Sequence, residues 1–286
     1  MPDGLLLVDK ERDWTSHDVA AKCRSLLHER RVGHGGTLDP MATGLLVIFA
    51  GRATRAVPYL PGNKTYTARM RFGIETDTQD ITGRVTREHE RIPPEGELIA
   101  ALPRFTGDIE QIPPMVSAVQ IGGQRLYKLA RQGIEIARPA RPVTIESLRL
   151  TGCADGEYEL EISCSAGTYI RTLIHDLGRA LGSGAVMTAL RRTRSGPFSV
   201  ENALPVRDVT EAALMPTDRL FEEYPALTLP PAHEKAARNG CSFPAGEVFL
   251  ESCMVRVYDA AGSFFMLGRH ENGLIHTEKS FFQPNG

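Results

Sequence analysis

The sequence lacks any long apolar run. No stretch of about 18 consecutive apolar residues occurs in the 286-residue chain, so we expect no membrane-spanning helix. The first residues, MPDGLLLVDK, lack the basic start and small-residue cleavage site of a signal peptide, and Asp9 interrupts their apolar cluster. We therefore expect a cytoplasmic protein.

Cysteine is scarce, and several standard motifs are missing. The five cysteines form no CxxC pair and no Cys/His cluster at zinc spacing, so we expect reduced thiols and no metal centre. No GxxxxGK[ST], G-x-S-x-G or HExxH segment occurs. Their absence argues against a P-loop nucleotide site, a serine hydrolase elbow and a zinc protease.

Overall positive charge is also missing, since the formal net charge is −2. Its distribution is uneven: residues 1–72 and 117–199 each carry 11 basic against 7 acidic residues, whereas residues 200–286 carry 7 against 12. Two basic segments that share one face of a fold would form a modest surface for a polyanion. Ordinary solvated charge explains the same counts equally well.

Strands are predicted by alternation. In residues 64–73 and 157–164, apolar side chains alternate with polar ones, which is typical of strands with one buried face. Residues 44–51 form a short apolar run between two glycines and predict a buried strand.

Helical spacing appears in two segments. Residues 16–27 predict a helix with Ser16 as its N-cap, and residues 168–181 predict another with Thr168 in that role. Strands and helices are mixed without a regular βαβ alternation, so we expect an α+β fold. The Pro-rich segment 224–235 predicts a boundary between a domain at 1–224 and a small β-rich module at 225–286.

One short loop is unusually rich in glycine. Residues 33–44 read GHGGTLDPMATG and contain a single carboxylate, Asp39. Gly35 and Gly36 permit positive φ and close approach of a ligand, and Pro40 biases Asp39 away from helical geometry. Two interpretations remain open from these residues: the loop presents Asp39 for chemistry, or the carboxylate merely caps a turn.

Four other residues also leave two interpretations open. Arg171 leaves the apolar stripe of its predicted helix, so it either pairs with a buried carboxylate or lies on the surface. Tyr66 faces the apolar side of its strand, as a core residue or as a stacking face for a base. Asp77 and Asp80 suggest either magnesium ligands of a phosphoryl-transfer enzyme or a solvated acidic loop.

Four segments together resemble a known family. In order along the chain they read GHGGTLDPMATGLL, KTYTARMRFGIETDTQD, PPMVSAVQIGGQRLYKLARQGIEI and CSAGTYIRTLIHDLG, followed by ALRRTRSGPF. This combination is similar to the TruB family of tRNA pseudouridine synthases, and the resemblance covers essentially the whole chain. It implies a pseudouridine synthase fold with a mixed, largely antiparallel sheet and a PUA-like C-terminal module.

The resemblance also implies a reaction. Members of the family isomerise the uridine at position 55, in the T loop of tRNA, to pseudouridine without a metal or organic cofactor. Asp39 matches the family's essential aspartate, Arg171 the arginine that pairs with it, and Tyr66 the tyrosine that stacks on the flipped uracil. Whether the aspartate attacks the sugar or removes a sugar proton stays open.

Further residues match by motif. Tyr169 and Leu190 match residues around the uracil, and His34 matches a histidine that fills the space left by the extruded base. Residues 120–138 match an insertion that contacts the T stem-loop, where the positive charges are Arg125, Lys128 and Arg131. We expect a monomer, because no exposed helical seam marks a partner surface. The main alternative is a tRNA-binding folding chaperone, which does not need Asp39.

Overall fold

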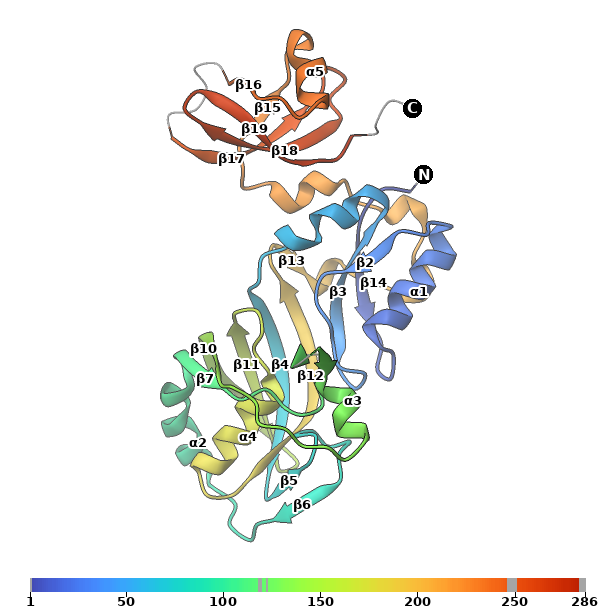
Figure 1. The fold of residues 1–286 in the computed structure, drawn as a ribbon. Coiled ribbons are helices and arrows are strands. Elements are labelled where there is room, and N and C mark those ends of the chain that lie inside the picture. The colour runs from blue at the N-terminus through green and yellow to red at the C-terminus, as the bar shows by residue number, and fades with distance from the viewer. Residues whose placement is uncertain (1, 118–119, 122, 246–250, 283–286) are drawn as a thin grey trace.

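The computed structural model describes residues 2–117, 120–121, 123–245 and 251–282. Figure 1 shows a large sheet flanked by helices, with a smaller, curled sheet at one end. Among the described residues, no helix is both long and apolar enough to cross a membrane.

A mixed sheet runs through the large body, with ten strands among the described residues. Its path follows the order β14 (Leu204–Pro205), β1 (Gly4–Lys10), β3 (Thr43–Ala50), β12 (Ala185–Ser195), β4 (Lys64–Phe72), β11 (Glu157–Cys164), β10 (Arg141–Ala154) and β7 (Gly107–Gln111). β2 (Val32–His34) pairs with β3, and β13 (Phe198–Ser199) pairs with β12. Pairing is antiparallel except for β1 with β14 and β3 with β12. The expected α+β class and largely antiparallel sheet are confirmed.

The three predicted strands are present. β4 buries Tyr66, Ala68, Met70 and Phe72 against the core, as its alternation indicates. β11 alternates in the same way. β3 is buried along almost its whole length because both of its faces are covered, one by α1 (Ser16–Leu27) and the other by η1 (Gly51–Tyr59).

Both predicted helices are present, but their predicted caps are wrong. α1 is capped by Thr15, which forms a capping box with Asp18. Ser16 is the first helical residue, and its hydroxyl forms hydrogen bonds with the backbone of Leu38 instead. α4 (Ile170–Ala180) has Tyr169 at its N-cap, while the Thr168 hydroxyl donates to Ser165.

Shorter elements complete the large body. They are β5 (Ile74–Thr76), β6 (Val85–Glu88), α2 (Glu95–Ala101), η2 (Leu102–Phe105), β8 (Gln120–Ile121), β9 (Gln124–Arg125), α3 (Leu126–Arg131), η3 (Val200–Asn202), η4 (Val206–Asp208), η5 (Glu211–Ala213) and η6 (Thr217–Phe221). β5 and β6 form one hairpin, and β8 and β9 form another. α2 and α4 pack on the β4–β11–β10 side of the sheet through one hydrophobic cluster.

The smaller sheet follows the large one in the chain. Its order is β15 (Ala226–Thr228), β17 (Cys253–Tyr258), β18 (Phe264–Glu271), β19 (Leu274–Ser280) and β16 (Phe243–Pro244), and α5 (Pro231–Arg238) packs on it. Phe221 is the centre of an aromatic cluster between the two bodies, with ring centroids 5.9–6.2 Å from those of Tyr59, Tyr224, Phe264 and Phe281. The two bodies therefore share a hydrophobic core.

Candidate active site

Asp39 lies in the loop that joins β2 to β3. The backbone is fixed on both sides of it. The Ser16 hydroxyl accepts a hydrogen bond from Leu38 N at 2.8 Å and donates to Leu38 O at 3.3 Å. On the other side, Pro40 O accepts from Asp13 N at 2.8 Å. The first turn of α1 and the residues before it thus hold the loop in one conformation.

Lys10 also holds the Asp39 loop in place. It is the last residue of β1 and is fully buried. Its ammonium group donates to three carbonyl oxygens: Trp14 at 2.6 Å, Glu11 at 3.0 Å and Pro40 at 3.1 Å. Burial lowers the pKa of Lys10 to about 8. This side chain was not among the predicted site residues.

Arg171 pairs with Asp39 through both carboxylate oxygens. Its Nε is 2.9 Å from Oδ2, and its Nη2 donates to Oδ1 at 3.1 Å. The Arg171 side chain is only 4% exposed, and it also donates to the carbonyls of Thr78 and Val116, both at 3.0 Å. Because a guanidinium is planar and matches a carboxylate in two places, this pair fixes the orientation of Asp39. Of the two interpretations of Arg171, the buried ion pair is confirmed.

A second buried carboxylate shares Arg171. Asp80 Oδ2 is 3.7 Å from Arg171 Nη1, and Asp80 Oδ1 accepts hydrogen bonds from the Thr78 hydroxyl and from the backbone N–H and hydroxyl of Thr82. Asp77 instead pairs with Arg84. These contacts give Asp80 a structural role beside Arg171, which the magnesium interpretation did not anticipate.

The charge of Asp39 is balanced between opposing influences. Burial raises the pKa of its carboxyl above the ordinary value of 3.8, and the nearby Asp80 adds to this. The Arg171 guanidinium acts in the opposite direction, as does Lys10 more weakly. A fixed carboxylate of this kind is suited to attack on an electrophilic carbon or to removal of a proton.

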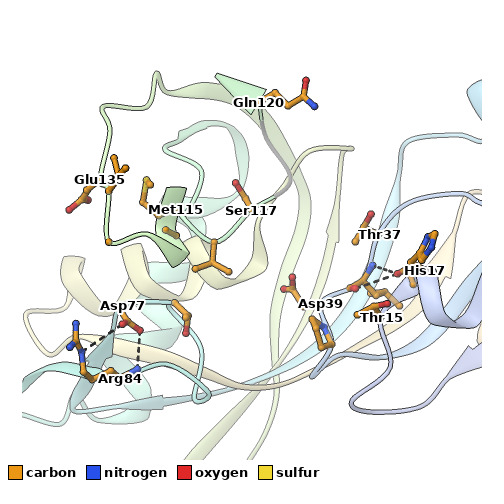
Figure 2. Close-up of a pocket in the computed structure, with 18 of the residues that line it drawn as sticks. Thr15, His17, Thr37, Asp39, Asp77, Arg84, Met115, Ser117, Gln120 and Glu135 are labelled. Carbon is orange, nitrogen blue, oxygen red and sulfur yellow. Dashed lines mark hydrogen bonds and ion pairs between the residues drawn. The ribbon is translucent and has the colours of Figure 1, made fainter. Parts of the chain in front are cut away.

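The Asp39 carboxylate lines a large cavity. The cavity measures about 1320 Å³ and is lined by the start of α1, the Asp39 loop, the β5–β6 hairpin, residues 115–117 and 120, and residues 130 and 133–135. Figure 2 shows Asp39 at the wall opposite Met115, Ser117 and Glu135. A small-molecule pocket usually occupies about 300–1,000 Å³. The volume suits entry of a segment of a larger molecule.

Tyr66 and Leu190 lie deeper in the structure. Each is 7% exposed, and both belong to the hydrophobic cluster that includes Leu38 from the Asp39 loop. Burial raises the pKa of Tyr66 above 10.0, and the positive charge of Arg192 opposes this. Tyr169 is held at the start of α4 by Gln111, whose amide accepts from Tyr169 N at 2.9 Å and donates to Tyr169 O at 3.3 Å.

His34 is at the end of β2 and lines the cavity beside Asp39. Burial, and then the charge of Arg192, lower its pKa, so the neutral imidazole is favoured. Its Nδ1 is buried and makes no hydrogen bond within the described part of the chain.

The three predicted basic residues of the insertion are only partly placed. Arg125 ends β9, and Lys128 and Arg131 belong to α3 beside the cavity, but their side chains lie outside the described structure. The structure brings Asp39 and Arg171 together and places His34 on the same cavity wall. Tyr66 and Leu190 share a hydrophobic cluster with Leu38 of the Asp39 loop, whereas Tyr169 is placed only by its position at the start of α4, two residues before Arg171. Sequence reasoning missed Lys10, Gln111 and Arg192, and it gave Ser16 and Asp80 roles other than the ones that the structure shows. For Lys10, the available signal was a lysine two residues after Val8, at the end of the segment GLLLVDK.

Two family models match this chain. The first, "TruB family pseudouridylate synthase (N terminal domain)", matches residues 24–170, and the second, "tRNA pseudouridylate synthase B C-terminal domain", matches residues 171–234. The chain is also similar to the tRNA pseudouridine synthase B of Synechococcus elongatus, with 44% identity over 281 residues, 95% of this chain and 96% of that protein. The protein of the same name from Heliobacterium mobile is 47% identical over 217 residues, 73% of this chain and 69% of that protein.

The fold is similar to one in a solved crystal structure of a Cbf5-Nop10-Gar1 complex. The TM-score is 0.74 at 26% identity, covering 99% of this chain and 86% of that chain. Both family models and the named relatives indicate the same family, and the similar fold is consistent with it. The chain belongs to the TruB family of pseudouridylate synthases.

Proposed function

We propose that this protein converts the uridine at position 55, in the T loop of tRNA, to pseudouridine. The observation that carries the proposal is the Asp39 carboxylate, held at two points by the buried Arg171 and open to a large cavity. The names of the relatives support tRNA as the substrate. A cytoplasmic location follows from that substrate.

The reaction is an isomerisation and needs no oxidant or reductant. The bond between N1 and C1′ breaks, and a bond between C5 and C1′ forms. The proton on C5 leaves, and N1 takes up a proton. Asp39 acts at the sugar, either by attack on C1′ or by removal of the proton on C2′, and both routes need an ionised carboxylate.

The surrounding residues have distinct roles in this proposal. Arg171 keeps Asp39 charged and oriented, and the Ser16 and Lys10 contacts fix the loop on either side of it. Tyr66 stacks on the uracil and takes the C5 proton, with Leu190 and Tyr169 completing the walls around the base. His34 fills the space that the flipped base leaves in the T loop. Arg125, Lys128 and Arg131 contact the phosphates of the stem.

We further propose that residues 225–286 form a PUA-like module separate from a catalytic domain at 1–224. The strand order from Ala226 onward supports this division. Residues 200–286 carry 7 basic and 12 acidic residues, so electrostatic attraction to RNA falls mainly to the catalytic domain. We propose that the protein works as a monomer and that its own residues suffice for the chemistry.

Mapping of the product tests the proposal. An unmodified tRNA transcript is incubated with the protein, and pseudouridine is located by carbodiimide labelling and primer extension. We expect a single stop that reports modification at position 55 and none in a transcript with cytidine there. Binding without any pseudouridine would favour the folding chaperone, and a stop at another uridine would contradict the T-loop assignment.

A further inference from the structure

A buried arginine lies beside the site and takes no part in the proposed reaction. Arg192 is on β12 and is fully buried. Its Nε donates to Leu45 O at 2.7 Å, and its Nη2 donates to Gly36 O at 3.2 Å. It therefore joins the central sheet to the Asp39 loop. Its Nη1 is buried and has no hydrogen-bond acceptor among the residues that the structure describes.

The register of the sheet places Arg192 directly across from Tyr66. β12 and β4 are antiparallel, and Arg192 and Tyr66 are paired positions. Directly opposite residues of an antiparallel pair point to the same face, with Cβ atoms about 4.5–5.5 Å apart. The guanidinium and the phenol thus lie on the same side of the sheet.

Gly36 brings the loop close to this arginine. Its φ is +105°, a conformation that other residues rarely adopt, and a Cβ atom placed on it would lie 3.6 Å from Arg192 Nη1. The loop that carries Asp39 therefore packs against the same guanidinium that faces Tyr66. The Arg192 guanidinium therefore lies between the Asp39 loop and Tyr66.

We propose that Arg192 is a positioning residue that holds the ionised Tyr66 in place against the Asp39 loop while Tyr66 takes the proton from C5. This inference rests on the proposed function. In the step, the phenolate accepts the C5 proton and becomes a phenol. The electron pair of the C–H bond re-forms C5=C6, and the pair from C6=N1 returns to N1, which takes a proton from water.

The charges around both groups agree with this role. Burial raises the pKa of Tyr66, and Cys164 and Asp39 raise it further, so Arg192 supplies the opposing positive charge. Burial lowers the pKa of Arg192, and Tyr66 opposes that change. The positive charge of Arg192 also lowers the pKa of three other groups: His34, Lys64 and Lys10.

The first test needs no RNA. The phenolate of Tyr66 is followed by ultraviolet absorbance, as the difference between each protein and its Tyr66→Phe variant. In Arg192→Gln we expect the Tyr66 phenolate to form at a higher pH than in the wild type. Arg191→Gln is the matched control, because Arg191 is the adjacent arginine and pairs with Asp9 instead. Equal titration in Arg192→Gln and the wild type would overturn the proposal.

The second test measures release of tritium from uracil C5 of the tRNA. We expect Arg192→Gln to bind tRNA normally but to release tritium about 10- to 100-fold more slowly, the range typical of a removed interaction with a charged group. The rate of tritium release should rise with pH in both proteins, and in Arg192→Gln this rise should occur at a higher pH than in the wild type. A loss of the same size at every pH would indicate a structural role only and would overturn the proposal.

Arg192→Lys decides the question if Arg192→Gln does not fold. A buried lysine loses its proton within the accessible pH range, whereas an arginine stays charged. Arg192→Lys should therefore be active near neutral pH and lose activity at alkaline pH, and a profile identical to the wild type would overturn the proposal. If the wild type releases no tritium, the proposed function fails, while the Tyr66 titration still tests the Arg192–Tyr66 pair.

Discussion

At the scale of single residues, the site depends on a carboxylate kept charged in a partly buried position. Asp39 is one-third exposed, whereas Arg171 beside it is almost fully buried. A buried cation without its partner is costly, so the two residues stabilise each other's position. The second carboxylate on Arg171, Asp80, shares the same guanidinium and raises the pKa of Asp39.

This balance predicts how activity responds to acid. Because the pKa of Asp39 is raised above 3.8, the carboxyl takes up a proton at a higher pH than an ordinary aspartate does. In the proposed function the ionised form is the active one, so kcat/KM for tritium release should fall as the pH drops through that raised value. A pH series on the folded protein checks this, and activity that persists unchanged down to pH 3.8 would contradict it.

Lys10 gives a second prediction at this scale, about stability. Its pKa is lowered from 10.5 to about 8 on folding, so between those values the unfolded chain binds more protons than the folded one. Folding stability from this group therefore rises with pH in that window. Denaturant unfolding from pH 7 to pH 10.5 should show the wild type gaining stability relative to Lys10→Met; a constant difference would show that the pKa of Lys10 is not lowered.

At the scale of elements, the first turn of α1 has two neighbouring hydroxyls with different tasks. Thr15 caps the helix, and Ser16 holds the backbone of Leu38 in the Asp39 loop. We therefore expect Thr15 to contribute mainly to stability and Ser16 mainly to activity.

Alanine at each position should therefore give different results. Thr15→Ala removes the cap, and we expect a loss of about 1 kcal/mol of stability with a smaller effect on rate. Ser16→Ala leaves the cap in place but frees the loop, so we expect a larger fall in tritium release than in melting temperature. Thermal unfolding and tritium release are measured on both variants. Equal effects of the two substitutions on rate would contradict the role of Ser16.

The same turn shows what sequence patterns can and cannot predict. Alternation located β4 and β11, and helical spacing located α1 and α4, because these periods follow from which face is buried. The cap was assigned to the wrong hydroxyl because Thr15 and Ser16 are both good caps, and the choice depends on the contact with Leu38. The burial of Arg192 could not be predicted for a similar reason, because it depends on the pairing of β12 with β3 and β4, which lie far earlier in the chain.

The site was predicted through resemblance more than through pattern. Local chemistry left Asp39 and Arg171 each with two interpretations, and only the fold shows that residues 132 positions apart form one ion pair. Asp80 was noticed as an acidic residue, but its threonine partners could not be inferred because they depend on the turn between β5 and β6. Of the two glycines singled out for positive φ, Gly36 has it, whereas Gly35 does not and instead leaves room for the Leu60 side chain.

At the scale of the whole molecule, the two sheets are joined by an aromatic cluster and by polar contacts. Arg55 donates to Ser280 O at 3.0 Å, and the Tyr258 hydroxyl donates to Asp218 at 2.6 Å. No pattern in the sequence indicated this, because the contributing residues come from η1, η6 and the last strands. The cluster suggests that both bodies unfold together.

Phe221→Ala tests that coupling. Phe221 is 1% exposed at the centre of the cluster, so the substitution should cost about 3–5 kcal/mol. We expect the single denaturant transition of the wild type to separate into two, with the smaller sheet unfolding first. One cooperative transition in the variant, with unchanged stability, would show that the cluster does not couple the two bodies.

The central claim is that Asp39 carries out the isomerisation, and one comparison tests it most directly. A tRNA transcript with tritium at uracil C5 is given to the wild type, Asp39→Asn and Asp108→Asn in the presence of EDTA; Asp108 is an exposed carboxylate on β7 that bonds to Thr144. We predict tritium release by the wild type and Asp108→Asn and none above background by Asp39→Asn, with all three folded and bound to the tRNA. Release by Asp39→Asn at the wild-type rate would contradict the account.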